Sequence, residues 1–192
     1  MKLSEFLPEY DIRSQHSTGV RATRAEVHDA LKGGPFSQIP VVRLLMRLRG
    51  LALKPSTMPM SESLRRRGFV ELYDSPAQEI AYGIVGQSWR PSGRRRTIDS
   101  PEHFAAFAQS GFAKAAWNFL LTSSSSSPQL TQLRTETRIR TYGRSTIWKS
   151  RTYWLAIAPF SGLLRRAILR DVKRRAAPVH RHTAARPWFR RL

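Results

Sequence analysis

The 192-residue sequence has no cysteine. This excludes disulfides, thiolate metal sites and cysteine nucleophiles, and it suits a reducing compartment. Long apolar runs are also missing: the longest, around residues 153–164, is interrupted by Pro159 and Gly162 and is shorter than the ~20 apolar residues that a membrane-spanning helix needs. The N-terminal stretch MKLSEFLPEYDIRS has no apolar run typical of a secretory signal. We therefore expect a cytoplasmic protein.

Acidic residues are scarce, with 13 against 33 basic ones and a formal net charge of +20. Such an excess is typical of proteins that bind nucleic acid or an anionic membrane surface. It also fits an arginine-rich composition spread over a solvated surface, because 27 of the 33 basic residues are arginine. The clusters lie on different predicted elements and form no single stripe, so nucleic acid is a less favoured partner. These clusters are Arg65–Arg67, Arg94–Arg96, Arg165–Arg166 and the tail from Lys173 onward.

Hydrophobic residues make up 41% of the chain, which is enough to form a core. Residues 11–21 alternate between apolar and polar positions and predict a strand with one buried face. Residues 112–122 and 129–142 alternate in the same way. Two further runs, 68–73 and 79–89, are separated by the turn residues Asp74-Ser75-Pro76 and predict an antiparallel hairpin.

Helical signals flank this run of strands. Thr23 and Glu26 have the spacing of a capping box, which predicts a helix that ends at Gly33-Gly34. A second helix is expected from residues 37–40 to Gly50, and a long one over residues 145–175 with a kink near Pro159. The apolar stripe of the second helix is predicted to be Val41, Leu44, Leu45 and Leu48.

This order of elements predicts an α+β fold in which a curved antiparallel sheet wraps around the long C-terminal helix, with two short helices after the first strand. Such an arrangement often leaves a cavity between helix and sheet. We expect one domain over residues 1–175, followed by a basic and flexible tail over residues 176–192.

Several stretches of the chain carry a resemblance to a known superfamily. They are LPEYDIRSQHSTGVRA, TRAEVHDAL, AYGIVGQSWRP, GFAKAAWNFLL, LRTETRIR and YWLAIAPFSGLLRRAILRDVKRRA, and together they cover about residues 7–175. The chain resembles the START and birch-allergen-like superfamily, also called SRPBCC, and within it an uncharacterised bacterial branch. The resemblance implies a helix-grip fold with a hydrophobic pocket for lipids, polyketides or similar molecules. Some members are cyclases, dehydratases or hydrolases, but no catalytic signature carries over to residues of this chain.

Candidate pocket residues are those predicted to line the space between the sheet and the long helix. His16 shares a strand face with Ile12 and Val20, where it either holds a ligand oxygen, acts as a general base or is a hydrogen-bonded core histidine. The other candidates either line the cavity or belong to the ordinary core. They are Trp89, Trp117, Thr135 and Thr137 on strands, and Trp154 and Ile157 on the long helix.

Three functions stay open from the sequence. The first is binding of a hydrophobic small molecule between sheet and helix, and the second is a cyclase- or hydratase-type enzyme that uses His16 in the same pocket. The third is electrostatic binding of nucleic acid or an anionic membrane. We expect no cofactor and no metal, because His180 and His182 lack a third ligand of fitting spacing, and a monomer is the default.

Overall fold

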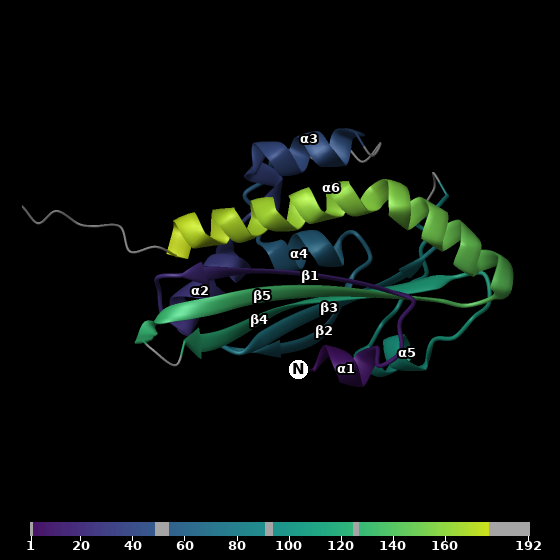
Figure 1. Ribbon diagram of the computed structural model, residues 1–192, viewed down its shortest axis with the longest axis horizontal. Helices are drawn as coiled ribbons and strands as arrows, with labels where there is room; N and C mark the ends of the chain where they lie inside the picture. Colours follow the sequence, from purple (N-terminus) through teal and green to yellow (C-terminus); the bar gives the residue numbers. More distant parts are fainter. Residues whose placement is uncertain (1, 49–53, 91–93, 125–126, 177–192) are drawn as a thin grey trace, which may run out of the picture.

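The computed structural model describes residues 2–48, 54–90, 94–124 and 127–176. It is the predicted α+β fold: a curved five-stranded antiparallel sheet with a long C-terminal helix packed along one face (Figure 1). The strands are β1 (Ile12–Val20), β2 (Val70–Ser75), β3 (Glu79–Gly86), β4 (Ala113–Ser124) and β5 (Ser127–Thr141). The helices are α1 (Leu3–Phe6), α2 (Arg24–Gly33), η1 (Phe36–Gln38), α3 (Pro40–Leu48), α4 (Met60–Arg65), α5 (Pro101–Ala106) and α6 (Arg144–Ala176).

The strand order is β1-β5-β4-β3-β2, so among the described residues β1 lies at one edge and pairs with β5 alone. We call the sheet face toward α6 the inner face and the face toward α1 and α5 the outer face. The register places side chains of the inner face in rows across the sheet. One row contains His16, Thr135, Phe119 and Ile80, and the next contains Ser14, Thr137, Trp117 and Tyr82.

The predicted capping box at the start of α2 is confirmed. The Thr23 side chain accepts a hydrogen bond from the backbone N–H of Glu26, and the Glu26 carboxylate accepts one from the backbone N–H of Thr23 at 2.7 Å. Because two donors at the helix start are satisfied this way, α2 begins where the sequence indicates. Gly34 follows its last residue, as predicted.

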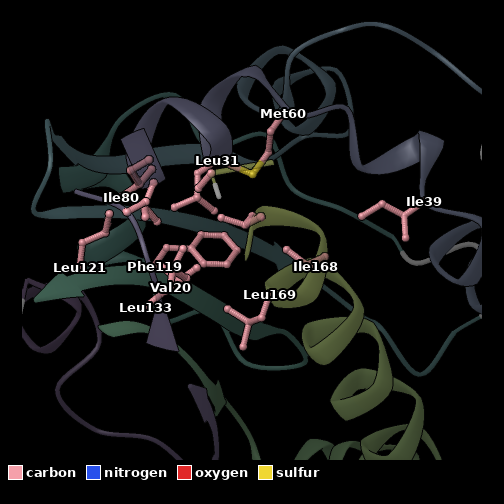
Figure 2. Close-up of a cluster of buried hydrophobic side chains, with 14 of the residues drawn as sticks. Val20, Leu31, Ile39, Met60, Ile80, Phe119, Leu121, Leu133, Ile168 and Leu169 are labelled. Carbon is pink, nitrogen blue, oxygen red and sulfur yellow. The ribbon is translucent and has the colours of Figure 1, made fainter. Parts of the chain in front are cut away.

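The inner core forms where the C-terminal half of α6 meets the sheet. Ile168 and Leu169 of α6 lie against Phe119 of β4, with α2 and α4 closing the other side (Figure 2). The N-terminal half of α6 contributes no residue to either buried core cluster. The helix runs through Pro159 and curves along its length (Figure 1). The apolar core therefore includes only the C-terminal half of the helix, although Thr146 and Ser150 in the N-terminal half are also buried.

A second core on the outer face is covered by α1 and α5. Phe104 of α5 is fully buried against β2 and β3. A Cβ at Gly83 would lie 2.7 Å from Cε2 of Phe104, so glycine is needed there for the ring to approach the strand. Gly83 thus marks a close approach of the Phe104 ring to the backbone of β3.

Several expected elements differ from the structure. The four-residue α1 and the six-residue α4 carry no side-chain cap, which explains why no signal predicts them. Between β3 and α5, the described residues form no further strand, and Arg96 forms a single bridge with Val85. On α3 the buried residues are Val42 and Leu45, whereas Val41, Leu44 and Leu48 are exposed. The tail is predicted over residues 176–192; Ala176 is the last residue of α6, and residues 177–192 lie outside the described residues.

Candidate functional site

The inner face carries a group of aromatic rings around Trp117 of β4. Its ring lies 4.9 Å from that of Phe69 and 6.1 Å from that of Tyr82, measured between ring centroids. Phe69 and Tyr82 in turn line a pocket of about 280 Å³ at the α4 side of the sheet. The other lining residues of this pocket, which we call the α4 pocket, are Ser61, Glu62, Arg65 and Glu71. The volume is close to the lower end of the range for small-molecule sites.

Buried polar atoms without a hydrogen-bond partner gather on the same face. Among the described residues they are the Trp117 indole N–H, the Thr135 hydroxyl and Nε of Arg165. Burial raises the pKa of Tyr82, and the charges of Glu71 and Asp74 add to this effect. Because buried polar groups are nearly always satisfied, such a concentration marks a place where a bound molecule could supply the missing partners.

Arg165 is the most unusual member of this group. It lies in the part of α6 that the sheet grips and is only 6% exposed. Its guanidinium carbon lies 4.4 Å from the centroid of the Trp117 ring, a favourable cation–π geometry. Burial lowers the pKa of Arg165 to about 10, so the side chain keeps its charge at pH 7.

His16 lies beside this group, on β1. Its imidazole packs against α6 where Gly162 leaves space, since a Cβ there would lie 3.6 Å from Cε1 of the ring. Burial lowers the pKa of His16, and the charges of Arg166 and Arg165 lower it further, so the ring is neutral at pH 7. Ser14 Oγ is 3.4 Å from its Nε2. A neutral imidazole in this position can exchange hydrogen bonds with a ligand, but among the described residues no carboxylate pairs with it to form a catalytic dyad.

The predicted site residues fall into two groups. His16, Trp117, Thr135 and Thr137 come together on the inner face, because β1, β4 and β5 are neighbours in the register. Trp154 and Ile157 are half-buried on the N-terminal half of α6 and belong to neither core cluster. Trp89 lies in a turn after the end of β3, where the Arg90 N–H bonds the Gln87 carbonyl at 2.9 Å. The predicted strand over 79–89 therefore ends three residues early.

The sequence predicts a cavity between the sheet and α6, but the pockets found in the structure lie elsewhere. The α4 pocket lies at the β2–β3 side, and a second pocket of about 460 Å³ opens mainly among outer-face residues. His16 borders that second pocket, but Trp117, Thr135, Thr137, Trp154 and Ile157 line neither. The remaining lining residues of the second pocket are Gln15, Ser17, Leu120, Thr122, Gln132 and Arg134.

The outer face contains a buried ion cluster centred on Glu136 of β5. Glu136 is 1% exposed and accepts hydrogen bonds from Arg13 at 3.0 Å, from Arg138 at 2.7 Å and from Gln15. Arg138 also donates to the backbone carbonyl of Leu7, just after α1. The N-terminal segment covers the cluster, which is why a charged residue on an outward position is buried. With every charge paired, the cluster has the character of a structural clamp.

Among the described residues no group of three or more His, Asp or Glu side chains is arranged to hold a metal ion. His180 and His182 lie outside the described residues. No helix in the part of the chain that the structure describes is both long and apolar enough to span a bilayer.

Comparison of the chain with protein-family models gave no match, and none of the curated proteins matches it. The functional interpretation therefore depends on the geometry of the inner face.

Proposed function

We propose that the protein binds a hydrophobic small molecule, such as a lipid or polyketide, on the inner face of its sheet, between the α4 pocket and α6. The observation that carries the proposal is the group of unsatisfied polar atoms on Trp117, Thr135 and Arg165, of which Trp117 contacts the two aromatic residues that line the pocket, Phe69 and Tyr82. Aromatic lining with a few convergent polar groups is typical of small-molecule sites.

The path from the pocket to these atoms leads through Phe69. This residue is half-buried, and its ring separates the pocket from Trp117. A rotation of the Phe69 side chain would extend the pocket to the Trp117 ring, on whose face Arg165 stacks. The proposal thus places the apolar body of the ligand against Phe69 and Tyr82 and its polar end beside Trp117. Membership of the SRPBCC superfamily and a cytoplasmic location belong to the same proposal, and both rest on the sequence.

Filling the α4 pocket should abolish ligand binding. Ser61 lines the pocket from α4, so Ser61→Trp should reduce the affinity for the neutral apolar dye Nile red at least tenfold, a change of about 1.4 kcal/mol. Ser63→Trp makes the same replacement on the same helix away from the pocket lining and should leave the affinity unchanged. Dye fluorescence measures the affinity, and native mass spectrometry of the purified protein would show a co-purified ligand. If the folded wild-type protein binds no dye and carries no ligand, the proposal is wrong.

A second candidate function is docking on an anionic membrane surface, and it rests on the outer layer formed by α3 and α6. These helices are in contact and lie side by side (Figure 1). Large apolar side chains are exposed on both: Leu48 is 65%, Trp148 71% and Leu155 78% exposed. Neither α3 nor residues 144–170 of α6 contain an acidic residue, whereas both contain several basic ones. Exposed apolar residues among basic ones suit the surface of an anionic bilayer.

The double variant Trp148→Ser, Leu155→Ser should bind vesicles of phosphatidylglycerol and phosphatidylcholine at least about tenfold more weakly than wild type, since each large apolar side chain contributes ~1.5–3 kcal/mol on burial. The wild-type protein should also bind more weakly to vesicles of pure phosphatidylcholine. High salt should weaken its binding to the anionic vesicles. Co-sedimentation measures the bound fraction. Equal binding of variant and wild type, or binding to duplex DNA but not to anionic vesicles, would contradict membrane docking.

A further inference from the structure

The environment of Arg165 differs sharply from that of the other buried arginine of the sheet region. Arg138, also 6% exposed, forms an ion pair with Glu136 and a hydrogen bond with the Leu7 carbonyl. Arg165 has no hydrogen bond and no ion pair among the described residues, and its guanidinium stacks on the face of Trp117. Burial alone accounts for the lowering of its pKa, with no carboxylate acting against it.

The buried polar groups around Arg165 are hydrogen-bond donors that lack an acceptor among the described residues. Nε of Arg165 and the Trp117 indole nitrogen can only donate, and the Thr135 hydroxyl is free to do so. Trp117 is paired across the strands with Thr137, and Thr135 with His16, so the register holds these side chains within one patch of the inner face. Gly162 and Arg165 are three residues apart on α6 and share the side that faces this patch.

Among the described residues, no carboxylate forms a hydrogen bond or an ion pair with a side chain of the patch. The charges that act on His16 in this patch are those of two arginines, Arg166 and Arg165. A buried positive charge without a counter-ion is unfavourable, and proteins usually keep a buried arginine paired. A ligand with a negatively charged end would supply both the counter-charge and the missing acceptors.

We propose that the ligand of the inner-face site is an amphiphile with one anionic headgroup, a carboxylate or a phosphate, and that Arg165 binds this headgroup. The inference rests on the proposed small-molecule function and specifies the chemical class of the ligand. The planar guanidinium presents paired N–H donors that match either headgroup. Thr135 and Trp117 donate to the remaining oxygens, and the apolar chain of the ligand lies along Phe69 and Tyr82 toward the α4 pocket.

Three ligands of equal chain length test the inference: dodecanoate, dodecyl phosphate and dodecanol, each titrated into the protein by calorimetry. At least one of the two anions should bind tenfold or more tightly than the alcohol, and the tighter one identifies the headgroup. Arg165→Gln should reduce the affinity for that anion to the level of the alcohol, and Arg165→Lys, which keeps the charge but not the paired donors, should fall between. Arg166→Gln removes the neighbouring charge at the surface and should leave the preference intact.

The outcomes separate the two proposals. If all three ligands bind equally well, or if Arg165→Gln keeps the full preference for the anion, the inference about Arg165 is wrong while the small-molecule site stands. If none of the three binds and Nile red does not bind either, the small-molecule function itself is wrong. Circular dichroism of each variant shows that the fold is intact, and Arg165→Lys provides the test if the glutamine variant does not fold.

Discussion

Replacing Glu136 with glutamine should lower the free energy of unfolding by about 3 kcal/mol. The substitution keeps the size of the side chain but leaves the buried Arg138 without its counter-charge, and breaking a buried ion pair on one side typically costs ~3–5 kcal/mol. The lower end is expected because Arg13, the other partner, is 42% exposed and can be hydrated. Urea unfolding followed by circular dichroism measures the change.

Glu62→Gln is the matched control. Glu62 also pairs with two arginines, Arg65 at 2.5 Å and Arg66 at 2.8 Å, but on the surface of α4. Exposed pairs of this kind contribute only ~0.2–1 kcal/mol, so the control should change stability by less than about 1 kcal/mol. If both variants lose the same amount, the burial of the Glu136 cluster does not matter and its role as a clamp is refuted.

The effect of Glu136→Gln should also depend on pH. Burial acts to raise the pKa of Glu136, but hydrogen bonds from Arg13, Arg138 and Gln15 outweigh it and hold the pKa below its ordinary value. A carboxylate with a lowered pKa in the folded state stabilises the fold above the unfolded-state pKa of about 4.3. This stabilisation is lost as the pH falls through the folded-state pKa. The difference between wild type and variant should therefore be constant near neutrality and shrink below about pH 4.

Replacing Arg165 with methionine should raise the free energy of unfolding of the ligand-free protein by about 2 kcal/mol. Methionine fills a similar volume without a buried unpaired charge, and removing such charges in favour of apolar side chains is often stabilising by ~1–4 kcal/mol. The lost cation–π contact with Trp117 opposes the gain by up to ~2 kcal/mol. In a chain of this size the melting temperature should rise by about 4–8 °C.

Arg166→Met is the control for this prediction. Arg166 is the exposed neighbour, and its replacement should alter stability by less than about 0.5 kcal/mol. Ligand-free protein, checked by native mass spectrometry, is needed because a bound anion would stabilise the wild type alone. A loss of 1 kcal/mol or more in Arg165→Met would show that the guanidinium stabilises the fold. A gain would mark Arg165 as a residue that lowers stability, as is common at binding sites.

Much of the fold could be predicted because local patterns and tertiary contacts agree in it. The alternation of residues 11–21 and 129–142 defines one buried face, and the structure pairs β1 with β5 on that basis. The capping box of Thr23 and Glu26 fixes the start of α2 by local hydrogen bonds alone. Such signals need no knowledge of distant residues.

The sequence-based predictions are wrong where contacts between distant segments determine the structure. α3 has apolar residues on two sides, and only contact with α6 and η1 determines that Val42 and Leu45 are the buried ones. Trp89 follows β3 after only Gln87 and Ser88, and the turn that begins at Gln87 takes it out of the sheet. The position of Glu136 depends on a short N-terminal segment that no sequence signal places over the outer face.

The candidate site was predictable in part. His16, Trp117, Thr135 and Thr137 lie on predicted strand faces, so pairing of the strands brings them together. Arg165 was missed, although a signal exists: it shares the helical spacing of the buried residues Ile168, Leu169 and Val172. A cation within an otherwise apolar stripe is the sign that could have identified it. The absence of a partner for its charge is visible only in three dimensions.

The edge position of β1 and the late place of α6 in the chain have a consequence for how the protein folds during synthesis. β1 is made early, but β5, its partner strand in the described part of the chain, begins more than a hundred residues later. α2 and α4 can cover part of the inner face, but the core around Phe119 is complete only when the C-terminal half of α6 has left the ribosome. A nascent chain therefore exposes both an unpaired strand and an apolar sheet face for most of its translation, a state that is prone to aggregation and suited to chaperone binding.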